Sequence, residues 1–385
     1  MDAEFNGDSL YNESISAAVL AMPYDAIQIQ GINNQQPSYI ISTNGTMVSA
    51  RNTLTENIEF EGNEPGSVIN SAIDATHSGI IRISEGDYNF LNPIRPKSNI
   101  SIIGEDIDNT VLNPQRAMSL IVNAHPNDPV LGIEDRNIVL GNFTINYEGV
   151  GGGDAINLVS VEKSRIFQVR IENISWSSDA IDLDACNDIF VESTDFLNIG
   201  GSAVHVSDSF TGWKSENKKG SNNITVVDAH ASNVGKERKV AAFNAFARDT
   251  AISGTNNITF TKILVENSYS GVDFAKFGSG YKVIDATIVD SLSRGITIRG
   301  MNNMITNATI FDTGSHGITV INSQETTIQN SSILKSNGNN IAITDSTDTH
   351  VMNVNLGETK NGEHLHILLK NTMHDLIDGI TILSK

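Results

Sequence analysis

The chain of 385 residues has little cysteine, proline, aromatic residue or positive charge. Its single cysteine, Cys186, cannot form an intramolecular disulfide and excludes a metal site built from several cysteines. The formal net charge of −20 argues against a nucleic acid or an anionic membrane as a partner of the whole surface. No apolar run approaches the roughly 20 residues that span a bilayer. We therefore expect neither a nucleic acid nor a membrane as the partner.

The residues that are present favour many short strands. Hydrophobic residues make up 39% of the chain, which is enough for a large core. Glycine, serine, threonine and asparagine are abundant, which is typical of short strands joined by polar turns. Residues 14–22, SISAAVLAM, are the nearest match to the core of a signal peptide, but acidic residues precede them. We read them as part of the fold or as the start of a mature chain, and we expect a secreted or cell-surface protein.

A repeat organises the chain from about residue 96 to residue 385. Segments of the form small-apolar-x-apolar recur, and most of their small residues lie 22 to 25 positions apart. These small residues are Ala155, Ala180, Ala203, Ala242, Gly271, Gly295 and Gly317. Further strand-like segments, such as 187–194 and 256–263, lie between them. A unit of about 23 residues with two or three short strands, no helix and asparagine at its turns predicts a β-solenoid, whose equivalent strands stack about 4.8 Å apart.

The start of the repeat carries a family resemblance. Residues 67–76, SVINSAIDAT, have the apolar spacing of an amphipathic helix that would cover the open end of a solenoid. They are followed by I-x-I-x-x-G-x-Y (81–88), S-N-I-S-I-x-G (98–104) and T-V-L (110–112). This order resembles the pectin-lyase-like right-handed parallel β-helix proteins over about residues 65–345. The resemblance implies an all-β, right-handed parallel β-helix with an N-terminal capping helix.

The domain boundaries follow from the same patterns. We expect the parallel β-helix domain over residues 61–385, and a capping or lateral segment over residues 1–60. The superfamily includes lyases, hydrolases, epimerases, transferases and phage tailspikes, so the fold does not choose the function.

One outward column of the predicted strands concentrates ionisable and amide groups. Residues two apart in a strand share a face, so the position two after each small residue should form a line across the coils. That line contains Asn157, Asp182, His205, Asn244, Asp273, Thr297, Thr319 and Ala342, and the next outward position contains Asp184 and Arg299. Single polar residues are ordinary on a solvated strand face. Asp, His, Asn and Asp on four consecutive coils predict a site.

Longer spacings beside this column predict loops. They are 39 residues between Ala203 and Ala242, and 29 between Ala242 and Gly271. Residues 214–248 contain seven basic and three acidic residues, a local charge of +4. We expect these loops to bind an acidic polysaccharide, because long loops on a rigid scaffold often carry binding residues. The candidates are Lys218, Lys219, Arg238, Lys239 and Arg248, with Trp213 either stacking on a sugar ring or pinning its loop.

β-Elimination on a uronate is one chemistry that fits this column. A cation must neutralise the carboxylate, a base must remove the C5 proton, and the leaving oxygen must be protonated. His205 or a nearby lysine is the candidate base, Asn244 a donor to the carboxylate, and Arg299 or a loop arginine the cation. Alginate and dermatan lyases of the superfamily are similar in having a lysine and an arginine on neighbouring coils, here Lys276 and Arg299. Only Asp273 matches their acidic calcium-binding pair, so calcium is a candidate that the sequence does not require.

Glycoside hydrolysis is the alternative chemistry. Asp182 and Asp184 would lie about 7 Å apart in a strand, within the roughly 6.5–9.5 Å of an inverting carboxyl pair. S-S-D-A-I-D (177–182) resembles the Asn-Thr-Asp-Gly motif of polygalacturonases, with Asp179 as the aspartate. The other three motifs of that family are missing, so we reject a polygalacturonase-type mechanism.

The sequence therefore predicts a lyase that cleaves a uronate-containing, alginate- or pectate-like polysaccharide. Its predicted catalytic residues are His205, Lys276, Arg299, Asn244 and Asp182, and its predicted substrate-binding residues are Asp184, Asp273, Trp213, Lys218, Lys219, Arg238, Lys239 and Arg248. A hydrolase, epimerase or fructan transferase that uses the aspartates is the first alternative. A non-catalytic adhesin or tailspike-like protein is the second.

Overall fold

The structure is a computed structural model that describes residues 35–124, 135–148, 150–175, 178–208, 220–247, 254–275, 277–359 and 366–383. Residues Pro37–Lys385 form one compact unit, and the description below concerns that unit. It is all-β, with about 61% strand and 4% helix. Among the described residues, no helix is long and apolar enough to cross a membrane.

The N-terminal end of this unit is covered by a small sheet and a helix. Strands β1 (Tyr39–Thr43), β2 (Val48–Asn52) and β3 (Ile58–Gly62) pair antiparallel, and β1 continues in parallel onto β4 (Gly79–Ile83). Helix α2 (Pro65–Ala75) lies where the amphipathic spacing predicted a helix. Glu64 caps it by accepting hydrogen bonds from the backbone N–H groups of Gly66 and Ser67. The helix buries an apolar face over the first coils, so that end of the core is closed.

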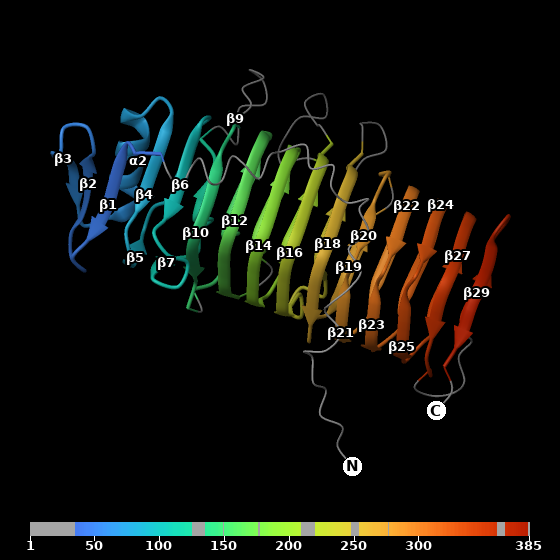
Figure 1. Cartoon of the computed structure of the whole chain (residues 1–385). Coiled ribbons are helices and arrows are strands. Elements are labelled where there is room, and N and C mark those ends of the chain that lie inside the picture. Colours follow the sequence, from blue (N-terminus) through green and yellow to red (C-terminus); the bar gives the residue numbers. More distant parts are fainter. Residues whose placement is uncertain are drawn as a thin grey trace, which may run out of the picture. The chain divides into compact units, whose positions relative to one another are not determined.

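From β4 onward the strands stack in parallel, coil upon coil (Figure 1). One stack of strands carries the predicted column of outward polar residues, and we call this stack the first face. It consists of β8 (Ile121–Val122), β11 (Ile156–Val159), β13 (Ile181–Asp184), β15 (Val204–Ser207), β17 (Ala241–Phe246), β19 (Ser270–Phe274), the beginnings of β22 (Ile296–Thr306) and β24 (Ile318–Gln329), β26 (Ile341–Thr344) and β28 (Ile367–Lys370).

The remaining strands build the other faces of the coils. They are β5 (Gly86–Phe90), β6 (Ile100–Gly104), β7 (Thr110–Pro114), β9 (Asp135–Arg136), β10 (Val139–Asn146), β12 (Val161–Ile174), β14 (Asn187–Ile199), β16 (Asn222–Val234), β18 (Asn256–Glu266), β20 (Lys282–Ile284), β21 (Thr287–Ser291), β23 (Thr309–Thr313), β25 (Ser332–Ser336), β27 (Thr347–Leu356) and β29 (Leu376–Ile382). The solenoid has about 11 turns with a spacing of about 25 residues. The right-handed parallel β-helix with a capping helix, predicted from the sequence, is confirmed.

Residues with positive φ turn the long strands at repeated positions. In β14 they include Ser193 and Asn198, with φ of 49° and 57°. Asparagine tolerates this left-handed conformation better than most residues do. Its side chain also links the coils, because Asn198 Nδ2 donates to Asn173 Oδ1 at 2.9 Å and Asn233 Nδ2 donates to Asn198 Oδ1 at 2.8 Å. The asparagines at the predicted turns therefore form a ladder along one corner of the solenoid.

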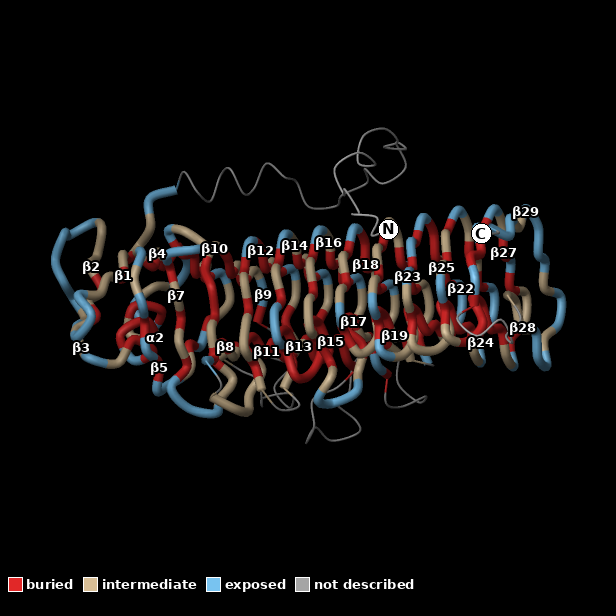
Figure 2. Tube along the Cα trace, turned by 90° about the horizontal axis from the view of Figure 1, so that it is seen from below, coloured by how far each residue is buried: buried red, intermediate tan, exposed pale blue. Residues whose placement is uncertain are grey.

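Buried residues recur from coil to coil along the solenoid (Figure 2), and their apolar side chains form one continuous core. Part of it is a row of rings. The ring centroids are 5.5 Å apart between Phe243 and Phe260, 5.2 Å between Phe260 and Phe274, and 4.5 Å between Phe274 and Tyr281. Phe243 belongs to β17, a strand of the first face, so this row also anchors the strand that bears the predicted residue Asn244.

We expect Asn198→Ala to lower stability more than Asn198→Gly does. Alanine loses the ladder hydrogen bonds and must also adopt positive φ, at a cost of about 1–2 kcal/mol. Glycine loses the same hydrogen bonds but accepts positive φ freely. The urea midpoint, followed by circular dichroism, should fall in the order wild type, Gly, Ala. A midpoint for Asn198→Ala equal to that of the wild type would contradict the proposed role of this corner.

Candidate functional site

The predicted column lies in one line on the first face. Strand register pairs Asn157 with Asp182, Asp182 with His205, His205 with Asn244, and Asn244 with Asp273. The flanking residues Ile181 and Leu183 are fully buried in the core, whereas Asp182 is partly exposed. The line therefore runs along the outer surface of the solenoid, across five successive coils.

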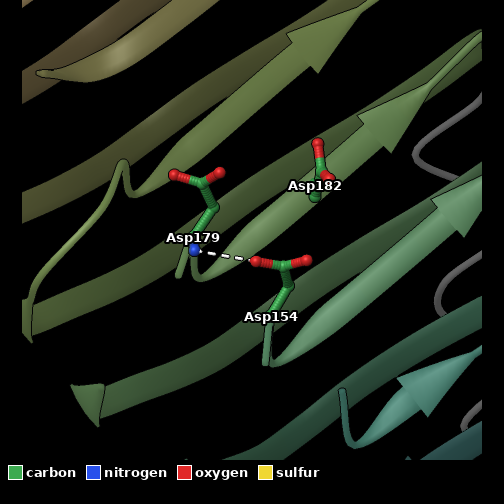
Figure 3. A group of neighbouring side chains, drawn as sticks. All are labelled: Asp154, Asp179 and Asp182. Carbon is green, nitrogen blue, oxygen red and sulfur yellow. Dashed lines mark hydrogen bonds between the residues drawn. The ribbon is translucent and has the colours of Figure 1, made fainter. Parts of the chain in front are cut away.

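Three carboxylates meet where β11 and β13 begin (Figure 3). Asp154 precedes β11, Asp179 precedes β13, and Asp182 is the second residue of β13. One oxygen from each lies within 4.8 Å of the others. The Asp179 N–H donates to Asp154 Oδ1 at 2.9 Å. The amide of Asn157 donates to both Asp154 and Asp182, at 3.2 Å and 3.3 Å, and so holds these two carboxylates side by side.

A cation neutralises one member of this acidic cluster. Arg238 Nη1 lies 2.9 Å from Asp179 Oδ2, and the Asp179 side chain is only 6% exposed. The backbone N–H of Ser202 donates to the other oxygen of Asp179. Arg238 is therefore bound to a protein carboxylate, although the sequence predicted that it would bind substrate.

The surroundings raise the affinity of the cluster for protons. Burial raises the pKa of Asp154 above its ordinary value, and the negative charge of Asp179 raises it further. Burial also raises the pKa of Asp179, and this is opposed by the Arg238 guanidinium and the hydrogen bond from Ser202. Two close carboxylates in such a place favour a state in which one of them carries a proton.

The same three oxygens could hold a hard cation, since carboxylates are the ligands that Ca²⁺ prefers. However, Arg238 already pairs with Asp179, so one of the three carboxylates is bound to a cation of the protein itself. We therefore interpret the acidic cluster as a proton-sharing group. Calcium stays a prediction.

His205 and Phe246 continue the site beyond the cluster. His205 is 8% exposed and is the register partner of Asp182 on one side and of Asn244 on the other. Its ring lies 6.5 Å from that of Phe246, with 29° between the ring planes. Phe246 is 39% exposed at the end of β17. An imidazole with a carboxylate as one register partner and an amide as the other is a candidate proton donor or acceptor.

Two further predicted residues bind each other. The Arg299 guanidinium forms an ion pair with Asp273, and it also donates to the Phe274 carbonyl at 3.2 Å. Burial raises the pKa of the Asp273 carboxyl, and the charge of Arg299 opposes that rise. Asp184 is 4% exposed and accepts a hydrogen bond from Ser207, which leaves it little surface for a substrate. Lys239 is exposed at a corner with φ of 61°.

The other predicted site residues lie outside the described residues. These are Trp213, Lys218, Lys219, Arg248 and Lys276. Their predicted roles in binding and catalysis stay predictions.

The sequence reasoning missed Asp154 as a site residue and gave Asp179 no role in the predicted site. A signal was present, because D-A-I-x-L occurs at 154–158 and again at 179–183. The two motifs start adjacent strands of the first face, which brings their aspartates together.

A hollow of about 390 Å³ lies elsewhere, over the later parts of β12, β14 and β16. Its charged lining is already paired. Arg170 binds Asp108 at 2.7 Å, and His230 Nε2 lies 3.0 Å from Glu266 Oε2. We read it as a surface network of ion pairs, separate from the site on the first face.

Comparison with known proteins gives the fold and not the reaction. No protein-family model and no curated protein matches the chain. Among solved structures, the catalytic unit of a thermostable α-1,3-glucanase from Streptomyces thermodiastaticus is similar with a TM-score of 0.60 and 13% identity, covering 84% of this chain and 68% of that one. The A-module of a mannuronan C-5 epimerase from Azotobacter vinelandii is similar with a TM-score of 0.53 and 12% identity, covering 84% of this chain and 94% of that one.

A surface adhesin of Streptococcus pneumoniae, PfbA, gives a TM-score of 0.53 with 12% identity, covering 83% of this chain and 88% of that one. The chain has the pectin-lyase-like fold. These structural neighbours include a glucanase, an epimerase and an adhesin, so at 12–13% identity they show the fold and leave the function of this chain to its own residues.

We expect Asp154→Asn to raise the thermal unfolding midpoint at neutral pH. A carboxyl whose pKa is raised by folding contributes stability at low pH and loses it as the pH rises through the folded value. At about pH 7 the wild type therefore bears the cost either of a charge at this buried position or of a proton held on Asp154. Asparagine removes that charge and keeps an oxygen for the Asp179 N–H.

The gain should vanish at about pH 3, below the ordinary carboxyl pKa, where both proteins are neutral at this position. Calorimetry at the two pH values measures it. Asp87→Asn, at an exposed aspartate of β5, is the matched control and should change neither midpoint. A midpoint for Asp154→Asn below that of the wild type at neutral pH would contradict this account of the cluster.

Proposed function

We propose that the protein is a glycoside hydrolase that binds a polysaccharide along the first face and cleaves it at the acidic cluster. The observation that carries the proposal is the meeting of Asp154, Asp179 and Asp182, with the pKa of Asp154 raised. Glycosidases use two carboxyl groups flanking the scissile bond, one protonated and one not. A raised pKa is what the acid of such a pair requires, because that carboxyl must hold a proton to donate.

Each carboxyl has a distinct place in this mechanism. Asp154, whose pKa is raised, donates its proton to the departing glycosidic oxygen. Asp182 is partly exposed on β13 and attacks the anomeric carbon as the bond from that carbon to the departing oxygen breaks. A water molecule, deprotonated by Asp154, then displaces Asp182 and releases the sugar. Asp179 is bound to Arg238 and supplies the charge that keeps the proton on Asp154. Asn157 fixes the distance between donor and acceptor because its amide binds both.

The two arginines of the predicted site favour hydrolysis over β-elimination. A lyase needs a cation to neutralise the substrate carboxylate. In the described part of the chain, Arg238 and Arg299 are each paired with an aspartate. With Asp179 paired to Arg238 and Asp154 protonated, the negative charge that remains on the cluster would also repel a uronate at the point of cleavage. Hydrolysis requires no substrate carboxylate, so neutral glucans belong among the candidate substrates.

One observation supports the lyase as the second candidate. His205 lies in register between Asp182 and Asn244. An imidazole that removes the C5 proton, next to an amide that donates to the uronate carboxylate, would form the core of such a site. A lyase would yield an unsaturated product that absorbs in the ultraviolet, whereas a hydrolase yields only new reducing ends.

We expect the chain to release reducing ends, without ultraviolet absorption, from at least one polysaccharide in a panel of α-1,3-glucan, dextran, pectate and alginate. Asp154→Asn and Asp182→Asn should each lower kcat by about 10²–10⁴-fold, the usual contribution of general acid–base catalysis. Asp87→Asn should leave kcat unchanged. Both products are measured on the same samples over a range of pH.

Three outcomes would overturn the proposal. Unsaturated product lost in His205→Ala but kept in Asp154→Asn would establish the lyase instead. Full activity in Asp154→Asn would show that Asp154 is not the general acid. Binding without any product would indicate an adhesin.

A further inference from the structure

Phe246 is an exposed aromatic ring on a face whose other outward side chains are mostly polar. It is 39% exposed, whereas Phe243 of the same strand is fully buried in the ring stack. Phe311, another exposed phenylalanine, differs because Lys335 lies over its ring at 5.3 Å from the centroid. The His205 ring lies 6.5 Å from that of Phe246, and 39% of Phe246 is still exposed. Because burying a phenylalanine is worth about 1.5–3 kcal/mol, this exposed part of the ring offers a favourable contact to a ligand.

The ring lies beside the line of site residues. Its register partner is Ser207, and Asn244, two residues earlier, points to the same side of β17. Asn244 is two coils from Asp182, a distance of about 10 Å at 4.8 Å per coil. A glycan that follows the line from the acidic cluster would therefore reach Phe246 within a few sugar units.

The polar group next to the ring is also available. Asn244 is partly exposed, and among the described residues no hydrogen bond occupies its side-chain amide. An amide offers two donors and an acceptor, which matches a sugar hydroxyl pair. An apolar ring beside a free amide is the combination that binds a pyranose, whose ring face is apolar and whose edge is hydroxylated.

We propose that Phe246 and Asn244 form a sugar-binding subsite, in which the ring stacks on a pyranose of the bound polysaccharide and the amide binds its hydroxyls. This rests on the proposed function only in that the ligand is a glycan. The patch is a single ring with polar neighbours, far smaller than the roughly 800 Å² per partner of a stable protein interface. The occupant is therefore a sugar and not a second protein.

Binding without turnover tests the subsite separately from catalysis. The full chain is run in native gels that contain soluble dextran, pectate or alginate, and retardation gives the affinity. Phe246→Ala should weaken binding to the retarding polysaccharide by about 2–12-fold, because an aromatic contact is worth roughly 0.5–1.5 kcal/mol. Phe246→Trp should restore it, and Asn244→Ala should weaken it. Phe311→Ala is the matched control and should bind as the wild type does.

In turnover assays Phe246→Ala should raise KM and leave kcat nearly unchanged. If the wild type cleaves nothing but its binding depends on Phe246, the subsite stands and the proposed hydrolysis fails. If Phe246→Ala binds as the wild type does, or if the wild type is retarded by none of the three polysaccharides, the subsite proposal is wrong.

Discussion

Main-chain hydrogen bonding between successive coils is the constraint on which the site depends. Each strand of the first face pairs in parallel with the next, so residues 22 to 39 positions apart in sequence become direct neighbours. A slip of one residue would turn every outward side chain inward. The inward residues Ile181 and Leu183 prevent such a slip, because it would expose them and bury Asp182. The apolar core thus fixes the position of the acidic groups that it excludes.

In the acidic cluster the scaffold holds carboxyl groups close together, an arrangement that is electrostatically unfavourable. Carboxylates close together and away from water repel one another, and the raised pKa values of Asp154 and Asp179 express that cost. The cluster is held by groups that the coil geometry supplies without further adjustment. The Asp179 N–H reaches Asp154 because the two precede adjacent strands, and Ser202 reaches Asp179 from the next coil. Groups of this kind persist in folded proteins when the surrounding structure determines their position.

The sequence was enough to predict the fold and the alignment of the outward residues. It was not enough to predict which side chains these residues contact. The period of about 23 residues and the alternation of apolar positions are enough to align Asp182, His205, Asn244 and Asp273, because strand stacking follows directly from them. Asp154 was missed because it lies in a turn before the strand, where the alternation gives no direction. The pairing of Arg299 with Asp273 was also hidden, since it depends on side-chain reach rather than on register.

The fold by itself does not determine which reaction, if any, the protein catalyses. The charged side chains on the first face limit the candidate reactions. Glucanase, epimerase and adhesin share this scaffold at about 12–13% identity. What differs between such proteins is which outward side chains their strands carry and how firmly these are held. Here the residue inward of Asn244 and Phe246 is Phe243, whose ring packs between Phe196 and Phe260. A strand anchored in this way holds its outward residues in place before any ligand arrives, so binding costs little ordering of the protein.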